Sequence, residues 1–286
     1  MDKRFKVNCS PWSNFGDTCV PYMLQKLDIP FIFAHHTVEK KVLMIGSILG
    51  IGNRKDSIVW GTGIIDDKTV ALPNAHYLAV RGPRTMQKLV DAGVDTTNVA
   101  MGDPAMLLPK MYNPTIEKTN KLGVIPHIMD FDLVRNHIVN NPEQFPNTIV
   151  INPNVPPSKI EGFIDEVLSC EKIVATCLHG VIGAHAYGIP AKWMKVGNRL
   201  AGDDIKFHDH FESVGITNLE PIGLINDENI EIDDFVSTLD IERLWDCRPW
   251  LNASDDYYVD IDEEGWENEC YPDNYGGKIV DDAWWK

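Results

Sequence analysis

The chain has 286 residues and a formal net charge of −16, and its length is sufficient for two hydrophobic cores. Hydrophobic residues make up 44% of the chain, a proportion typical of globular proteins. The negative charge argues against nucleic acid as a partner, because surfaces that bind nucleic acid are rich in Lys and Arg. Eleven acidic residues and two lysines lie in the last 36 positions. An anionic ligand would therefore need a local group of cationic residues.

The start of the chain lacks the long apolar stretch of a signal peptide. Residues 42–51 form the longest apolar stretch, which is far shorter than the roughly 20 residues needed to span a bilayer. We therefore expect a cytoplasmic protein without a membrane span. The six cysteines show no CxxC pair and are predicted to be reduced thiols. Cys177 lies beside His179, where we expect a small buried residue rather than a thiolate nucleophile.

In the first half of the chain, buried strands are predicted at residues 42–49, 57–64 and 77–80. Pro83 then suits the first position of a helix, which apolar residues continue at helical spacing and Gly93 ends. Residues 99–101 form a further predicted strand, and the Asp103-Pro104 step a turn. The polar residues 113–120 lack periodicity and are interpreted as a linker.

The second half repeats the alternation, with strands predicted at residues 122–126 and 148–151 and an amphipathic helix at residues 160–168. Residues 172–196 then predict a strand, a tight turn, a helix of small residues that Gly188 ends, and another strand. His179 lies at the end of the first of these strands, where ligands bind in open α/β sheets. The helix that begins there offers free backbone N–H groups to an anion.

Alternating strands and helices in both halves predict an α/β protein with two Rossmann-like, doubly wound domains that face a cleft. The predicted domains are residues 1–112 and 121–240. Residues 241–286 form an acidic extension that is rich in Trp and Tyr. Its rings are predicted to pack on the main body, and a sugar-stacking surface is the alternative.

Several residue types in this pattern suit chemistry on an anion. Arg81 and Arg84 flank Gly82-Pro83 at the predicted helix start, and a guanidinium grips carboxylate or phosphate bidentately. His179 is the best candidate for a general acid or base, since an imidazole titrates near neutral pH. Asp17 could accept a proton or cap the helix that follows it. Lys206 could help to bind an anion.

Four glycines, Gly16, Gly46, Gly61 and Gly63, are expected to let the backbone approach a ligand or a neighbouring strand. His185 is expected to be structural. The His208-Asp209-His210 segment is weak evidence for a metal, and we assign no metal site.

Seven short motifs in order resemble the polysaccharide pyruvyl transferase family. They are Asn14-Phe15-Gly16-Asp17, Gly46-Ser47-Ile48-Leu49, Val59-Trp60-Gly61-Thr62-Gly63-Ile64, Val80-Arg81-Gly82-Pro83-Arg84-Thr85, Gly102-Asp103-Pro104-Ala105, Ile125-Pro126-His127 and Leu178-His179-Gly180. The resemblance runs from about residue 14 to about residue 215. It implies a fold like that of the GT-B glycosyltransferases and transfer of the enolpyruvyl group of phosphoenolpyruvate to a sugar as a pyruvate ketal. Phosphoenolpyruvate would be the donor substrate, with no other cofactor.

The acceptor implied is a sugar of a polysaccharide or of its lipid- or nucleotide-linked precursor. Some family members carry Arg before Leu-His, and here that position is Cys177. We therefore expect Arg81 and Arg84 to hold phosphoenolpyruvate, with Leu178 beside it and His179 handling the proton.

Two other functions stay open from the sequence. A GT-B glycosyltransferase would use a nucleotide sugar and would bind a nucleotide diphosphate in place of phosphoenolpyruvate. A non-catalytic sugar-binding relative would keep the fold without the chemistry. In the latter, substitution of His179 would not change sugar binding.

Overall fold

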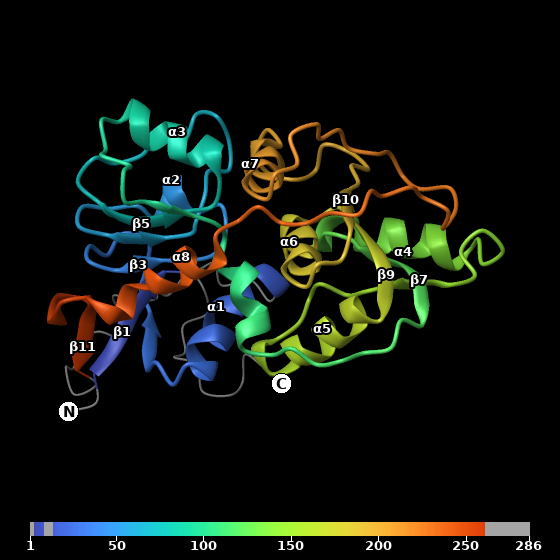
Figure 1. Ribbon diagram of the computed structural model, residues 1–286, viewed down its shortest axis with the longest axis horizontal. Helices are drawn as coiled ribbons and strands as arrows, with labels where there is room; N and C mark the ends of the chain where they lie inside the picture. The colour runs from blue at the N-terminus through green and yellow to red at the C-terminus, as the bar shows by residue number, and fades with distance from the viewer. Residues whose placement is uncertain (1–2, 9–13, 261–286) are drawn as a thin grey trace.

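Two sheets form the frame of the molecule (Figure 1). The computed structural model describes residues 3–8 and 14–260. The first sheet has the strand order β11-β1-β3-β4-β5-β6, and β2 also pairs with β1. All of its pairings are parallel except that of β11 with β1. Its strands are β1 (Lys3–Asn8), β2 (Phe31–Phe33), β3 (Val42–Leu43), β4 (Ile58–Trp60), β5 (His76–Val80), β6 (Ala100–Met101) and β11 (Tyr258–Asp260).

The described residues of the first half also form three α-helices and one long 3-10 helix. They are α1 (Phe15–Lys26), α2 (Leu49–Gly52), α3 (Pro83–Asp91) and η1 (Pro104–Lys110). Pro83 is the first residue of α3, and Gly93, with a φ of 75°, follows its end. Both limits of this helix agree with the sequence. Proline suits the first turn because it has no N–H to leave unpaired, and glycine takes a positive φ without a steric penalty.

The second sheet is parallel throughout and has the strand order β10-β9-β7-β8. Its strands are β7 (Asn120–Ile125), β8 (Thr148–Val150), β9 (Cys170–Ala175) and β10 (Ala191–Trp193), and its helices are η2 (Ile128–Asp130), α4 (Phe131–Val139), η3 (Pro157–Lys159), α5 (Ile160–Leu168), α6 (Leu178–Ala186) and α7 (Ile205–Ser213). The predicted strand, turn, helix and strand of residues 172–196 are β9, α6 and β10. The two parallel sheets confirm a Rossmann-like α/β class.

After α7 the chain returns to the first sheet through α8 (Ile241–Asp246), η4 (Pro249–Leu251), η5 (Asp255–Tyr257) and β11. Trp60 Nε1 donates to the carbonyl of Leu244 at 3.1 Å, and the Trp60 and Trp250 rings meet edge to face at 5.3 Å. Residues 241–260, the first part of the predicted extension, therefore pack on the first half. Residues 261–286 lie outside the described residues.

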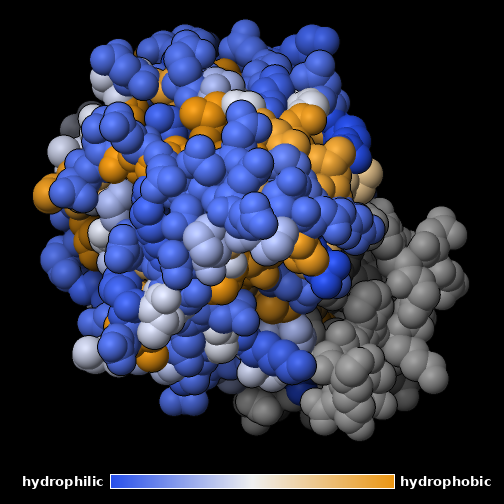
Figure 2. Space-filling view, turned by 90° about the vertical axis from the view of Figure 1, so that its right-hand side faces the viewer, coloured by the Kyte–Doolittle hydropathy of each residue, from blue (hydrophilic) through white to orange (hydrophobic). Residues whose placement is uncertain are grey.

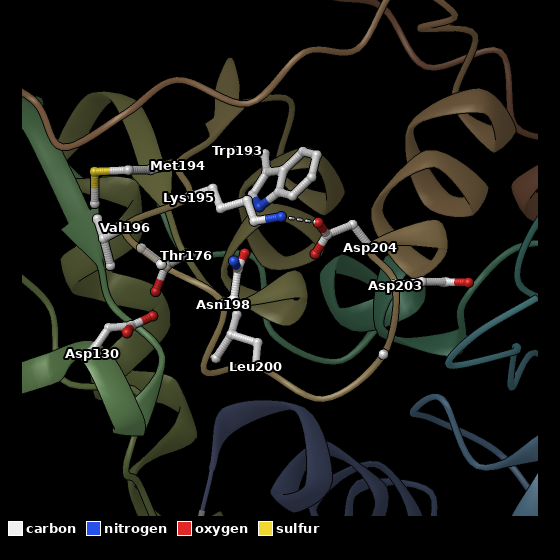
Figure 3. A pocket seen from close by; sticks show the side chains of 12 residues that line it. Asp130, Thr176, Trp193, Met194, Lys195, Val196, Asn198, Leu200, Asp203 and Asp204 are labelled. Carbon is white, nitrogen blue, oxygen red and sulfur yellow. Dashed lines mark hydrogen bonds and ion pairs between the residues drawn. The ribbon is translucent and has the colours of Figure 1, made fainter.

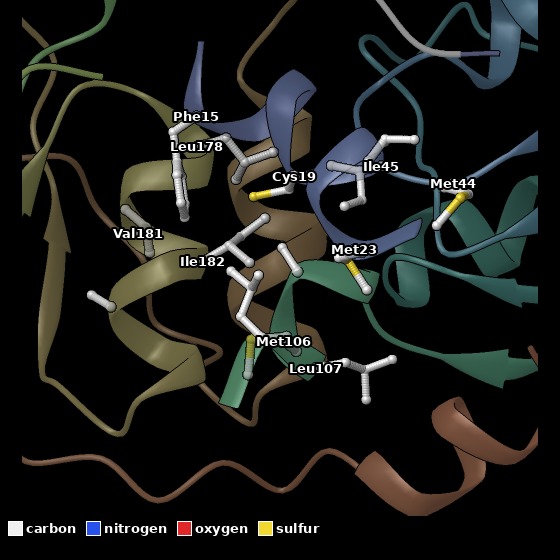
Figure 4. Packing of buried hydrophobic residues seen from close by; sticks show 14 of the residues in the cluster. Phe15, Cys19, Met23, Met44, Ile45, Met106, Leu107, Leu178, Val181 and Ile182 are labelled. Atoms are coloured by element: carbon white, nitrogen blue, oxygen red, sulfur yellow. The ribbon is translucent and has the colours of Figure 1, made fainter. Parts of the chain in front are cut away.

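One continuous core joins the two halves. The Phe15 ring of α1 stacks on Phe163 of α5, with ring centroids 4.1 Å apart. Figure 4 shows side chains of α1 and η1 packed against Leu178, Val181 and Ile182 of α6. Helix α1 follows the first strand of the first sheet, yet it packs mainly on elements of the second half. The predicted division at residues 113–120 and the GT-B-like arrangement stay predictions.

The surface in Figure 2 is mostly hydrophilic, with hydrophobic residues scattered in small groups. Among residues 3–8 and 14–260, no helix has both the length and the apolar character needed to cross a membrane.

Candidate functional site

A pocket of about 450 Å³ lies where the two halves meet. We call it the central pocket. Its walls come from the start of α1, the loop before α2, the η2 region, the start of α6, and the loop that leads into α7. The lining residues are Asn14, Phe15, Gly16, Asp17, Gly46, Ser47, Ile48, Ile51, Ile65, His127, Ile128, Met129, Pro153, Cys177, Leu178, His179, Gly180, Arg199, Leu200, Ala201 and Lys206.

Two helices begin at the central pocket. Asn14 caps α1: its side chain accepts a hydrogen bond from the Asp17 backbone N–H at 3.1 Å. Cys177 stands at the corresponding position of α6 and makes no side-chain capping bond. The N–H groups in the first turn of a helix have no partner within the helix, and the macrodipole adds partial positive charge there. The start of α6 is therefore suited to an anion.

His179 lies between Gly16 and a buried carboxylate. Its Nε2 is 3.6 Å from Oδ2 of Asp103, whose side chain is completely buried. Among the described residues, neither of these two atoms has a hydrogen-bond partner. The other carboxylate oxygen of Asp103 accepts from the Ala105 N–H at 2.9 Å. This bond fixes the carboxylate behind the imidazole.

Gly16 leaves the room that the imidazole occupies. A Cβ on Gly16 would lie 2.1 Å from Nδ1 of His179. No side chain can therefore replace this glycine without moving the ring. Nε2 faces Asp103, and Nδ1 lies on the side of Gly16 and α1. The predicted close approach at Gly16 is to this side chain.

The cationic side chains of the central pocket come from the second half. Lys206 lies in the first turn of α7, and its Nζ donates to the Ala201 carbonyl at 2.9 Å. Burial, and then the charge of Arg81, lower the pKa of Lys206. Arg199 is half-exposed and lies 3.5 Å from the carboxylate of Asp130. Burial, followed by the charge of Lys206, lowers the pKa of His127.

Asp17 is the one carboxylate among the described residues that line the central pocket. It accepts a short hydrogen bond from the Asn14 amide. Cys177 and Leu178 lie beside it, at the start of α6. Burial raises the pKa of the Cys177 thiol to about 12, which favours the neutral thiol and opposes a role as nucleophile.

Of the nine predicted site residues, five line the central pocket: His179, Asp17, Gly16, Leu178 and Lys206. The structure does not bring Arg81, Arg84, Gly61 or Gly63 to it. A Cβ on Gly61 would lie 2.1 Å from the Pro104 ring, and one on Gly63 would lie 2.4 Å from the Arg81 guanidinium. These two glycines therefore serve close packing within the protein.

Arg81 and Arg84 join the two halves. Arg81 is completely buried and donates to Asp209 of α7 at 3.0 Å, to Ser47 at 2.7 Å and to the Ile64 carbonyl at 2.7 Å. Arg84 pairs with Glu212 at 2.6 Å. Both guanidiniums bond to protein carboxylates and neither lines the central pocket, so the expectation that these arginines hold an anion stays a prediction. Arg81 still supports the pocket wall through Ser47.

Three residues of the site were not predicted. Arg199 and His127 line the pocket, and Asp103, which the sequence suggested to be a turn residue, contacts His179. Asp103 and His127 each follow a predicted strand, and a polar side chain at that end of a parallel strand is the available signal. Arg199 lies in a loop without periodicity, so nothing in the sequence distinguished it.

Within the described ranges, no three His, Cys, Asp or Glu side chains form a group that could hold a metal ion. His210 of the suspected segment instead bonds to His185, with Nε2 and Nδ1 3.0 Å apart. Both rings are buried, so His185 has the structural surroundings that the sequence predicted.

Known proteins resemble this chain in sequence. The family model described as polysaccharide pyruvyl transferase matches residues 22–195. The uncharacterized protein L143 of Acanthamoeba polyphaga mimivirus is 30% identical over 209 residues, which cover 69% of this chain and 70% of that protein. A functionally uncharacterized protein of Klebsiella pneumoniae subsp. pneumoniae NTUH-K2044, known from its crystal structure, is 12% identical. The match covers 78% of this chain and 93% of that one with a TM-score of 0.44, which is too low to carry an argument.

The family match covers more than half of the chain and contains β4, β7 and β9 with the motifs at their ends. It also contains the start of α6 and His179. The chain belongs to the polysaccharide pyruvyl transferase family.

Proposed function

We propose that this protein transfers the enolpyruvyl group of phosphoenolpyruvate to a sugar as a pyruvate ketal, with the central pocket as the active site. The observation that carries the proposal is the local charge of this pocket. A protein with a net charge of −16 lines it with Lys206, Arg199 and the uncapped start of α6, against one carboxylate among its described lining residues. Such a site suits a small, multiply charged anion.

Lys206 and Arg199 take the binding role that the sequence suggested for Arg81 and Arg84. The lowered pKa of Lys206 reflects burial, and a bound anion would compensate this cost. Arg199 would have to exchange its 3.5 Å contact with Asp130 for the ligand. A guanidinium can do so at modest cost when its existing pair is long and partly exposed.

His179 is suited to proton transfer through Nδ1. The Asp103 carboxylate, 3.6 Å from Nε2, would favour a proton on that nitrogen, so that Nδ1 of the neutral ring accepts a proton and the carboxylate stabilises the imidazolium that forms. The protonated ring would deliver its proton to the methylene carbon of phosphoenolpyruvate while C2 gains oxocarbenium character. A first sugar hydroxyl, with its proton accepted by Asp17, would then form a bond to C2.

A second hydroxyl would displace phosphate from C2, and its proton would leave with the phosphate. The products are the cyclic ketal and inorganic phosphate. Each step uses only groups of the pocket and the two substrates. The second hydroxyl must approach C2 from outside the anion site, so the acceptor needs its own binding surface.

Calorimetric titration of phosphoenolpyruvate tests the donor without knowledge of the acceptor. Lys206→Met should weaken binding at least tenfold, equivalent to about 1.4 kcal/mol, because it removes a partly buried cation that lines the pocket. Arg84→Met is the matched control, since it removes a cation that lies outside the pocket. UDP and a UDP-hexose serve as comparators.

Binding that Lys206→Met weakens and Arg84→Met does not would support the proposal. Equal weakening by both variants would mean that the central pocket is not the donor site. Binding of the UDP ligands alone would favour a glycosyltransferase.

A further inference from the structure

A second pocket of about 330 Å³ lies at the carboxyl ends of the strands in the second sheet. We call it the strand-end pocket. It is lined by Asp130, Thr176, Trp193, Met194, Lys195, Val196, Gly197, Asn198, Leu200, Gly202, Asp203 and Asp204. Figure 3 shows Asp130 and Thr176 on one side of it and Asp203 and Asp204 on the other. The motifs of the family resemblance supply none of these residues.

The position of this pocket follows from the order of the strands. The chain passes from β7 to β8 on one side and from β9 to β10 on the other, so the direction of winding changes between β7 and β9. Thr176 follows β9, and Asp130 lies in the turn after β7. The crevice outside the carboxyl ends of strands at such a switch point is where open α/β sheets bind ligands.

The strand-end pocket and the central pocket are neighbours. Leu200 lines both of them. The ion pair between Arg199, which lines the central pocket, and Asp130, which lines the strand-end pocket, also lies between them, at 3.5 Å. The loop of residues 197–204 is therefore a shared wall.

The chemistry of the strand-end pocket differs from that of its neighbour. Three aspartates line it against one lysine among the described residues, and that lysine, Lys195, is already paired with Asp204. A phosphate or carboxylate would meet repulsion here. Carboxylate oxygens instead accept hydrogen bonds from hydroxyl groups, and the amide of Asn198 both donates and accepts. This set of groups suits a neutral polyhydroxyl compound.

We infer that the strand-end pocket binds the sugar ring of the acceptor and presents its hydroxyls to the central pocket across Leu200. The inference rests on the proposed function for the identity of the acceptor, whereas the preference of this pocket for a neutral polyhydroxyl compound follows from its own lining. Its volume has room for one pyranose ring. The acidic lining excludes the donor anion, so each pocket selects one of the two substrates.

Saturation-transfer NMR with four simple probes tests the inference: the methyl β-pyranosides of glucose, galactose, mannose and N-acetylglucosamine. Asn198 is exposed, so Asn198→Ala should fold normally. Asp204→Asn removes an acceptor charge at a residue with a φ of 70°, which asparagine tolerates well. Asn218→Ala is the control, an exposed amide outside both pockets.

We expect at least one glycoside to bind to the parent protein. Asn198→Ala or Asp204→Asn should weaken that binding fivefold or more, while Asn218→Ala leaves it unchanged. Phosphoenolpyruvate affinity, measured by calorimetry on the same variants, should stay within twofold of the parent value. Circular dichroism confirms that each variant is folded.

Three results would overturn the inference. The first is the absence of binding by any of the four glycosides, the second is a bound glycoside that responds to Lys206→Met and not to Asn198→Ala, and the third is competition by phosphate for the site. Failure of the proposed function looks different. In that case the glycoside still binds at the strand-end pocket, whereas phosphoenolpyruvate does not bind to the parent protein.

Discussion

Two arginine–carboxylate pairs join the start of α3 to α7, one from Arg81 just before the helix and one from Arg84 in its first turn, and they should differ greatly in their effect on stability. Arg81 and Asp209 are both 0% exposed in their side chains, whereas Arg84 and Glu212 are 43% and 21% exposed. Asp209 also accepts from the N–H and the hydroxyl of Thr85 at 2.9 and 2.7 Å. Removing one partner of the buried pair would leave a charge in the protein interior without its counter-ion.

Arg81→Met should lower the free energy of unfolding by about 3–5 kcal/mol, because a buried charge loses its partner. Arg84→Met, in the first turn of α3, should lower it by at most about 1 kcal/mol, because water solvates what remains of an exposed pair. Asp209→Asn and Glu212→Gln provide the reciprocal halves of two double-mutant cycles. The coupling energy should be large for the first pair and small for the second.

Guanidinium denaturation, followed by tryptophan fluorescence, measures these free energies. Trp60, which is completely buried in the first half, is one probe among the tryptophans. The reasoning is refuted if Arg81→Met costs no more than Arg84→Met. If Arg81→Met were as stable as the parent protein but had lost affinity for phosphoenolpyruvate, the sequence-based role of Arg81 in anion binding would be restored.

Four further predictions concern the central pocket and the core behind it. Asp103→Asn should reduce kcat by roughly 10²-fold or more and leave the affinity for phosphoenolpyruvate unchanged, because an amide cannot stabilise the protonated imidazole as the carboxylate does. Unchanged turnover in a ketal-forming assay would contradict this prediction. Gly16→Ala should reduce kcat at least tenfold in a folded protein, since the new Cβ would displace the His179 ring from a point 2.1 Å away; a crystal structure with an unmoved ring would refute the reason. Cys177, with its pKa raised to about 12, should react with iodoacetamide at pH 8 at least about a hundredfold more slowly than free cysteine, because the thiolate is the reactive form. Mass spectrometry of tryptic peptides measures the rate, and rapid labelling would show the prediction to be wrong. Burial lowers the pKa of His185 from 6.5 to about 3, so between these pH values the unfolded chain binds a proton that the folded protein does not. The free energy of unfolding should therefore fall as the pH drops below about 6.5, by up to about 1.4 kcal/mol per pH unit. His185→Gln should reduce this pH dependence in denaturation at pH 7 and pH 5, and an unchanged dependence would count against the prediction.

Much of the fold was predictable because local rules and tertiary structure agree. Pro83, Gly93 and Gly188 each mark a helix end for a backbone reason that holds in any context. The predicted strand at residues 42–49 was too long. It ends at Leu43, and Gly46 turns the chain with a φ of 106°. The buried Met44 and Ile45 made this loop resemble a strand, because burial alone does not distinguish the two.

The site was predictable only as far as it depends on position in the chain. His179 and Gly16 follow strands and begin helices, which places them at the carboxyl edges of the sheets. The role of an arginine depends instead on what faces it from distant segments. Asp209 lies 128 residues from Arg81, and no pattern near Arg81 reveals this buried carboxylate. The buried pairing of Arg81 was therefore missed for the same reason that the contact of Asp103 with His179 was missed.

The same contacts predict that the proposed active site is sensitive to how the two halves pack against each other. Arg81 bonds both to Asp209 of α7 and to Ser47 in the wall of the central pocket, and α7 carries Lys206 in its first turn. A change in the α3–α7 contact would therefore move groups from both halves that face one ligand. Because a misplacement of about 1 Å can cost 10²-fold in rate, the buried arginine can influence catalysis without touching a substrate. Its variants should then lower kcat together with stability, whereas variants of Arg84 should lower neither by much.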